Sequence, residues 1–199
     1  MTLPLEGVRV VDLTSVLSGP LCTMMLGDAG ADVIKVESPA GDQARTWGPP
    51  FWGDQGTEFL AVNRNKRSVV LDDKLTLAAL LKNADVLITD RSTEQLAALG
   101  VNGIDAEPYT PNPKLVRVCI SPWGDRGPLK NAKGSELAAQ AMAGYTRYLG
   151  SRDAPACRLG ADVACAGTGI FAVQATLAAL IARAKSGVGQ RVTLSLLNS

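Results

Sequence analysis

The feature that most constrains this chain is a strand, a helix and a second strand that follow one another near its N-terminus. Residues 8–13 are rich in valine and predict a buried strand. Gly19 and Pro20 mark the start of a helix that is expected to end near Gly27, and residues 32–37 predict the second strand. A strand–helix–strand unit this short forms a right-handed parallel crossover. This part of the chain therefore predicts a parallel sheet covered by helices.

The same alternation continues along the rest of the chain. Further strands are predicted at residues 68–71, 85–89, 115–120 and 192–196, and helices at residues 75–82, 92–100, 135–149 and 163–185. Ser92 and Gln95 have the spacing of a capping box at a helix start. Residues 39–67 are expected to form a long irregular segment, which in a compact domain is usually functional. The pattern predicts an α/β fold with a mostly parallel open sheet flanked by helices.

The composition removes several classes of function. The chain contains no histidine, which excludes Ser-His-Asp triads, histidine bases and histidine metal ligands. Its four cysteines are Cys22, Cys119, Cys157 and Cys165, and none forms a CxxC pair, so no metal site is expected. We expect them to be buried thiols in a reducing cytoplasm. The net charge of +1 offers no general attraction to nucleic acid or membranes.

Two segments bear on where the protein is located. The N-terminus has neither a basic region nor an apolar core of the signal-peptide kind, which indicates a cytoplasmic protein. Residues 163–182 are long enough to span a bilayer. Because they include many small residues as well as Thr168, Gln174 and Thr176, we interpret them as a helix buried in a large soluble core.

Asp162 stands at the start of that apolar helix, and no charged residue follows it until Arg183. One interpretation is a helix N-cap, since aspartate is a favoured capping residue. The other is a carboxylate nucleophile that its apolar neighbours desolvate and that small residues leave open to a substrate. These residues alone leave both interpretations open.

A basic cluster of Arg64, Lys66 and Arg67 precedes the strand at residues 68–71. It is either a solvated charged turn or a set of cationic donors that recognises phosphates. The loop after the first strand lies at the carboxyl edge of the sheet, where open α/β folds bind ligands. No G-x-G-x-x-G occurs, which argues against a nicotinamide-dependent oxidoreductase.

Several stretches together resemble the family III CoA-transferases, which include formyl-CoA transferase and the carnitine CoA-transferases. The matching pieces occur in the family's order along nearly the whole chain: residues 4–10 with 12–14, Gly19-Pro20, residues 30–37, Gly41-Asp42 with Arg45, residues 65–68 with 71–72, residues 84–86, Asn112-Pro113, residues 121–124 with 127–128, and residues 187–190 with Val192. The racemase branch pairs a histidine with an aspartate, and this chain has no such histidine.

The resemblance implies a Rossmann-like sheet and a role for Asp162 as nucleophile. Asp162 would attack an acyl-CoA carbonyl, form a mixed anhydride and then an aspartyl-CoA thioester, from which an acceptor acid takes the CoA. Acyl-CoA and a small carboxylic acid are the implied substrates, coenzyme A the implied cofactor, and no metal is implied. Residues 1–199 would be the N-terminal portion of the family's large domain, without its small domain and C-terminal return.

The resemblance also assigns CoA contacts residue by residue. They are Leu17 and Ser18 beside the thioester, Ser38, then Leu71, Asp72, Asp73 and Lys74 on the adenine side, Asp90, Arg91 and Ser92, and finally Lys133, Gly134, Ser135 and Glu136. The segment around Asp90 departs from the family's Asn-Phe-Arg-Pro-Gly-like pattern, and small residues near Ala98 replace an expected arginine.

Family members are about twice as long and form interlocked dimers. The chain stops directly after its last predicted strand, which we interpret as an interruption. A homodimer or a complementary chain that supplies the missing half is therefore expected. The alternative function is a non-catalytic CoA-binding or partner subunit of a split CoA-transferase.

Overall fold

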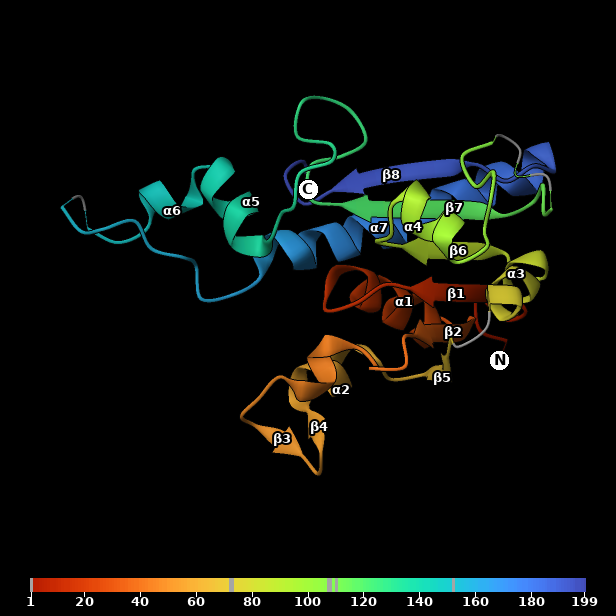
Figure 1. Ribbon diagram of the computed structural model, residues 1–199, viewed down its shortest axis with the longest axis horizontal. Helices are drawn as coiled ribbons and strands as arrows, with labels where there is room; N and C mark the ends of the chain where they lie inside the picture. Colours follow the sequence, from red (N-terminus) through yellow and green to blue (C-terminus); the bar gives the residue numbers. More distant parts are fainter. Residues whose placement is uncertain (1, 72–73, 107–108, 110, 152) are drawn as a thin grey trace.

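A six-stranded parallel sheet organises the molecule (Figure 1). The computed structural model describes residues 2–71, 74–106, 109, 111–151 and 153–199, and the side chains of residues 74–76 are also left aside. The sheet has the order β5-β2-β1-β6-β7-β8, and every adjacent pair is parallel. Its strands are β1 (Arg9–Leu13), β2 (Asp32–Glu37), β5 (Lys66–Val70), β6 (Val86–Thr89), β7 (Val116–Ser121) and β8 (Arg191–Ser195). The expected α/β class is confirmed.

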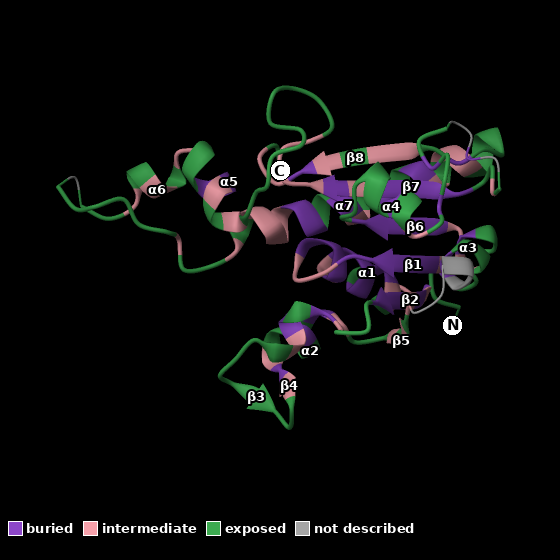
Figure 2. Ribbon diagram, in the orientation of Figure 1, coloured by how far each residue is buried: buried purple, intermediate pink, exposed green. Residues whose placement is uncertain are grey.

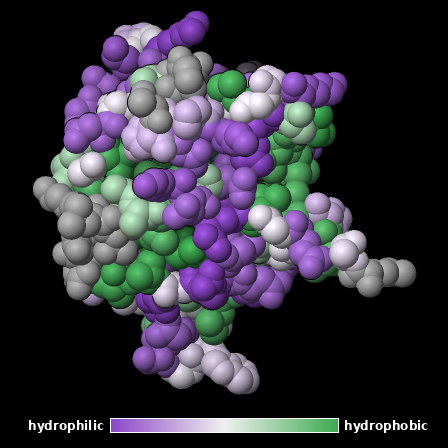
Figure 3. All heavy atoms as spheres, turned by 90° about the vertical axis from the view of Figure 1, so that its right-hand side faces the viewer, coloured by the Kyte–Doolittle hydropathy of each residue, from purple (hydrophilic) through white to green (hydrophobic). Residues whose placement is uncertain are grey.

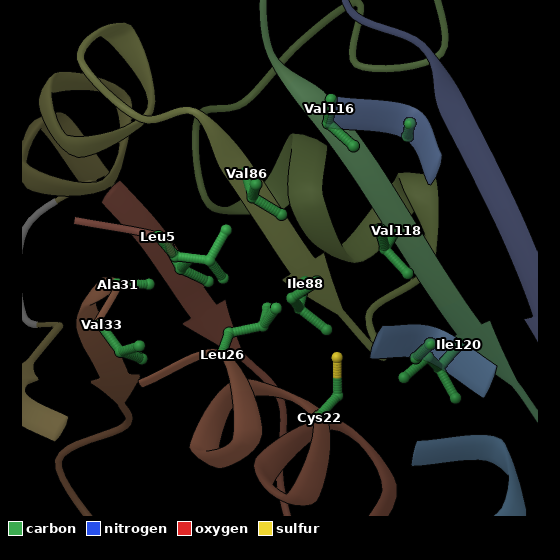
Figure 4. Close-up of a cluster of buried hydrophobic side chains, with 13 residues drawn as sticks. Leu5, Cys22, Leu26, Ala31, Val33, Val86, Ile88, Val116, Val118 and Ile120 are labelled. Atoms are coloured by element: carbon green, nitrogen blue, oxygen red, sulfur yellow. The ribbon is translucent and has the colours of Figure 1, made fainter. Parts of the chain in front are cut away.

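Helices cover both faces of this sheet. One apolar core lies between the sheet and helices α1 (Ser18–Asp28) and α7 (Val163–Ser186). Figure 4 shows Cys22 and Leu26 of α1 pointing toward Ile88 of β6 in this core. The second core lies on the other face, under α3 (Lys74–Lys82) and α4 (Thr93–Ala98), where Leu77, Leu81 and Leu96 are buried. Strand residues with alternating directions supply both cores, as expected for a sheet covered on two sides.

Helix α7 is not the fully buried helix that its composition predicted. Its buried residues are Thr168, Gly169, Ala172, Thr176 and Ala179, which are mostly small and allow close packing against α1 and the sheet. Large apolar side chains on its other side remain exposed, namely Ile170, Phe171, Leu177 and Ile181. The helix is long and apolar enough to cross a membrane by length and composition, but here one face packs on the sheet. Local hydrophobic periodicity could not show which face of α7 packs on the sheet and which stays exposed.

Two other expectations need correction. Residues 39–67 are not wholly irregular, because they contain the short helices η1 (Gln43–Thr46) and α2 (Thr57–Val62) and a small hairpin of β3 (Phe51–Trp52) and β4 (Gln55–Gly56). The helix expected at residues 135–149 is divided into α5 (Glu136–Met142) and α6 (Tyr145–Tyr148). Gly144 separates them in the left-handed conformation, with φ of 85°, which ends the first helix. Figure 2 shows that both regions project from the sheet and are largely exposed.

The strands all point toward the same edge, beyond which α5 and α6 project (Figure 1). The chain runs outward from β1 to β2 and β5 on one side and then returns to β6, β7 and β8 on the other. The reversal of order lies between β1 and β6, which is where open α/β sheets bind ligands. Figure 3 shows the opposite edge, where a central band of hydrophilic residues is flanked by apolar ones.

Candidate active site at the carboxyl edge of the sheet

The loop after β1 and the loop after β6 meet at this reversal point. The backbone amide of Ser15 donates to Asp90 Oδ2 at 2.9 Å, and Arg91 Nη2 donates to Ser15 Oγ at 3.2 Å. Desolvation of its carboxylate by the surrounding chain raises the pKa of Asp90, although 31% of the side chain stays exposed. Two of the predicted CoA-contacting residues, Asp90 and Arg91, are therefore joined directly to the first loop.

A buried ion pair between Lys35 and Asp42 holds the loop after β1 in place. Lys35 Nζ lies 2.8 Å from Asp42 Oδ2, and both side chains are only 1% exposed. Lys35 also donates to the carbonyl of Thr14 at 3.0 Å, while the amide of Val16 donates to Asp42 Oδ1 at 3.3 Å. Val16 has a φ of 69°, which is unfavourable for a β-branched residue. The conformation that presents Leu17 and Ser18 is therefore maintained by contacts from β2 and the segment that follows it.

The basic cluster at the start of β5 serves the fold rather than an open phosphate site. Lys66 Nζ lies 3.1 Å from Asp12 Oδ2, and the two side chains are 2% and 0% exposed. Burial alone would raise the pKa of Asp12, but Lys66, Lys35 and the hydroxyls of two threonines lower it. Arg64 pairs with Asp28 at 2.5 Å and Arg67 with Asp32 at 2.6 Å, both near the surface. The two arginines are solvated charges, Arg64 in the turn and Arg67 on β5, whereas Lys66 is a buried structural cation.

Asp162 occupies the N-cap position of α7, but its side chain makes no capping hydrogen bond. The amides of Ala164 and Cys165 donate instead to Glu136, at 3.0 Å to Oε1 and 2.7 Å to Oε2. The capping interpretation of Asp162 is therefore correct for its position and wrong for its side chain. The carboxylate of Asp162 pairs with Arg158 and is 29% exposed, so it is open to a partner other than its own helix.

Glu136 was predicted to contact CoA, and the structure gives it a second set of contacts. Burial alone would raise its pKa, but hydrogen bonds from Gln140 and from the amides at the start of α7 lower it. An ionised carboxylate at this place also interacts favourably with the helix dipole. Gln140, which sequence reasoning missed, is 1% exposed and bonds to Glu136 Oε1 at 2.7 Å. The only sequence signal for it was its position one helical turn after Glu136.

The start of α1 lies against the second turn of α7. A Cβ atom at Gly169 would lie 2.8 Å from the carbonyl oxygen of Ser18, so only glycine permits this approach. Ser18 therefore lies against α7, the helix that begins directly after Asp162. Cys165 is a second nucleophile candidate here, but burial raises the pKa of its thiol to about 12. A neutral thiol is a poor nucleophile, so Cys165 is the weaker candidate of the two.

A cavity of about 790 Å³ lies between the ends of β6 and β7, helix α4 and the loop before α5. Its lining includes four of the predicted CoA contacts, namely Asp90, Arg91, Ser92 and Lys133. Residues far apart in sequence thus meet in one hollow, and their contact with CoA stays a prediction. Gly134, Ser135 and Glu136 follow Lys133 directly and lead from this cavity into α5. Ser135 caps α5, because its side chain accepts from the amide of Ala138.

The remaining predicted contacts lie along the same edge on the side of β2 and β5. Leu71 donates its amide to the carbonyl of Glu37 at 2.7 Å, which places it beside Ser38. Lys74 is the first residue of α3. Asp72 and Asp73 lie outside the described residues. The adenine-side assignment of these residues stays a prediction.

A second cavity, of about 570 Å³, lies between α7 and β8 and contains none of the predicted residues. Phe171 and Gln174 of α7 line it together with Ser195 and the last two residues of the chain. Within the part of the chain that the structure describes, no cluster of three acidic or cysteine side chains is placed to hold a metal. The expected cysteine burial holds for Cys22, whereas Cys157 is exposed; all four thiols are free.

Comparison with known proteins decides the family. The model of CoA-transferase family III matches residues 5–199. The chain belongs to CoA-transferase family III. It is 39% identical to a mouse succinyl-CoA:glutarate CoA-transferase over 98% of this chain and 46% of that protein. It is 40% identical to succinate–glutarate CoA-transferase of Agrobacterium fabrum, covering 98% of this chain and 51% of the relative. A Streptomyces avermitilis formyl-CoA:oxalate CoA-transferase is 37% identical, with 98% and 48% covered.

A solved structure of the same kind agrees with this family III assignment. The crystal structure of a CAIB/BAIF family protein from Brucella suis superposes with a TM-score of 0.92 at 35% identity. The superposition covers 100% of this chain and 54% of that one. The family III chain described here therefore spans about half the length of the relatives that it matches. Its sheet and the placement of its helices are those of the family.

Proposed function

We propose that this chain takes part in the transfer of coenzyme A between an acyl-CoA thioester and a carboxylic acid, with Asp162 as the nucleophile. The observation that carries the proposal is the state of Asp162 in a family III chain. Its carboxylate stands at the start of α7, while Glu136 takes over the capping of that helix. A carboxylate released from a structural role and partly exposed suits covalent catalysis.

The transfer proceeds in four steps, and the CoA thiolate leaves and returns twice. Asp162 attacks the carbonyl carbon of the acyl-CoA and expels the CoA thiolate, forming a mixed anhydride. The thiolate attacks the aspartyl carbonyl, which frees the donor acid and leaves an aspartyl-CoA thioester. The acceptor carboxylate attacks this thioester and expels the thiolate, giving a second anhydride. Attack of the thiolate on the acceptor carbonyl of that anhydride yields the new acyl-CoA and restores the Asp162 carboxylate.

The contacts around Asp162 set conditions on this proposed chemistry. Arg158 pairs with the carboxylate in the resting state and is itself 47% exposed. Acylation removes the charge of Asp162, so Arg158 loses its partner at that step. The amides of Ala164 and Cys165 are occupied by Glu136 and are not free to bind a developing oxyanion. Oxyanion donors must therefore come from other groups.

Small dicarboxylic acids are the proposed acceptors. The relatives cited above are named for succinate, glutarate and oxalate, and the mouse protein is 39% identical to this chain. We further propose that coenzyme A occupies the carboxyl edge from Leu71 and Ser38 to Lys133, and that the protein is cytoplasmic. The catalytic unit would be a homodimer, or this chain with another polypeptide segment that supplies the remaining half.

The test is trapping of the proposed intermediate. The protein, with any continuing or complementary chain, is incubated with succinyl-CoA and hydroxylamine and then digested for mass spectrometry. We expect a hydroxamate at Asp162 and its absence from an Asp162→Asn variant. An Asp162→Glu variant serves as the second control, because it keeps the charge but moves it by one methylene. Transfer activity without any modification of Asp162 would refute the nucleophile assignment.

A further inference from the structure

The short helix α5 contacts the chain on both sides of Asp162. Gln140 lies in this helix and is 1% exposed. Its Oε1 accepts from the amide of Leu159 at 3.0 Å, and its Nε2 donates to the carbonyl of Ala161 at 3.1 Å. One buried side chain thus holds both Leu159 and Ala161, in the segment that leads directly into Asp162.

The chain after Asp162 is held from the same helix. Glu136 accepts from the amides of Ala164 and Cys165, as described above. Gln140 Nε2 donates to Glu136 Oε1 at 2.7 Å, which fixes the two side chains relative to one another. Asp162 therefore sits between two anchored segments, and α5 supplies both anchors.

The ion pair with Arg158 does not explain this placement. The guanidinium is 47% exposed and the carboxylate 29%, and ion pairs this exposed to solvent are weak. Removing a buried side-chain hydrogen bond costs more, because its partner is left unsatisfied. The segment before Asp162 is otherwise irregular, since α7 begins only at Val163. The buried amide is therefore the stronger restraint on the position of Asp162.

We propose that Gln140 is a positioning residue that holds the backbone of Asp162 in the orientation needed for attack. Because the nucleophile is itself part of the proposed function, this inference rests on that function. The side-chain amide is suited to the task because it offers an acceptor to Leu159 and donors to Ala161 and Glu136 at once. Neither a carboxylate nor an apolar side chain offers both.

The test compares Gln140→Glu and Gln140→Leu with the wild-type protein. The first readout, which needs no activity, is hydrogen exchange of residues 157–168. We expect the amide of Leu159 to lose about tenfold or more of its protection in Gln140→Leu, which removes its acceptor, equivalent to about 1.4 kcal/mol. Gln140→Glu keeps an acceptor for Leu159 but has no donor for the Ala161 carbonyl and Glu136, so we expect a smaller loss at neutral pH. That smaller loss is recovered at low pH, where the carboxyl regains a proton to donate, whereas the loss in Gln140→Leu is not.

The second readout separates binding from chemistry. Dissociation constants for succinyl-CoA are expected to stay within about twofold, while hydroxamate formation at Asp162 slows by about a hundredfold, the cost of a displaced reacting group. Gln174→Leu makes the same chemical change on the exposed side of α7 and should alter neither readout. Gln140→Glu has nearly the volume of glutamine and guards against loss of folding.

The outcomes separate the two proposals. Unchanged exchange at Leu159 overturns the positioning role whatever the activity. Faster exchange with unchanged labelling of Asp162 also overturns it, because the restraint would then have no catalytic consequence. If wild-type Asp162 is never labelled while transfer proceeds, the proposed nucleophile fails, and with it the catalytic meaning of the restraint, while hydrogen exchange still reports whether Gln140 holds the segment.

Discussion

At the scale of single residues, Glu37 at the end of β2 joins the sheet to the segment that follows. Its carboxylate accepts from Arg45 Nη2 at 2.6 Å, from the amide of Asp42 at 2.9 Å and from Ser68 Oγ at 2.5 Å. Burial alone would raise the pKa of Glu37, but these donors outweigh it and lower the pKa from 4.5 to about 2. Such a group stabilises the folded state only while it is ionised.

Glu37 therefore predicts a loss of stability in acid. Its contribution is fully present above pH 4.5 and disappears as the pH falls from 4.5 to about 2. The shift corresponds to about 3 kcal/mol of unfolding free energy. Denaturant titrations at a series of pH values should show this slope, and Glu37→Gln should flatten it. Equal slopes in wild type and variant would contradict the assignment.

Neighbouring cations on β5 predict contrasting costs. Lys66→Met leaves the carboxylate of Asp12 buried without its main partner and should lower the unfolding free energy by about 3–5 kcal/mol. Arg67→Met removes an ion pair whose arginine is 68% exposed and should cost at most about 1 kcal/mol. Chemical denaturation of both variants measures the difference. Similar losses for the two would show that burial does not distinguish these pairs.

At the scale of elements, two glycines of α7 have opposite expected effects. A methyl group at Gly169 would lie 2.8 Å from the Ser18 carbonyl and 3.2 Å from Leu21 Cβ, so Gly169→Ala should cost about 1–3 kcal/mol by forcing α1 and α7 apart. Nothing lies within 4 Å of the same position at Gly167, and Gly167→Ala should stabilise by up to about 1 kcal/mol through helix propensity. Thermal unfolding compares them, and a stabilising Gly169→Ala would refute the close packing.

At the scale of the whole molecule, the exposed apolar face of α7 predicts association. Ile170, Phe171, Leu177 and Ile181 are all more than a third exposed, and the chain spans about half of its relatives. We expect the isolated chain to self-associate at micromolar concentration and Phe171→Glu with Ile181→Glu to shift it toward monomer in analytical ultracentrifugation. Leu60→Glu, at a single exposed leucine on α2, is the control. A monomeric wild-type chain at all concentrations would contradict this.

Several features followed from local sequence patterns. The strand predicted at residues 32–37 is β2, and the capping box of Ser92 and Gln95 forms as expected. Gly187 ends α7 in the left-handed conformation, with φ of 76°. These features depend on side-chain alternation and on hydrogen bonds between residues a few positions apart, which a sequence displays directly.

The opposite holds for the groups that arrange the site. Nothing near Glu136 in sequence indicated that it caps a helix beginning 27 residues later, nor that Gln140 holds the segment before Asp162. Lys66 belongs to a basic cluster whose sequence is typical of a solvated turn, yet its ammonium group is buried against Asp12. Each of these contacts joins elements distant in the chain, so each depends on how the elements pack.

The sequence by itself determined the parallel α/β class, most strand and helix positions and the candidacy of Asp162, because these depend on periodicity, turn chemistry and ordered motifs. Only the tertiary structure decided that the carboxylate of Asp162 does not cap its own helix, that Glu136 does the capping and that one face of α7 is exposed. The physical reason is that buried polar groups must find partners, and which partner is within reach is set by packing.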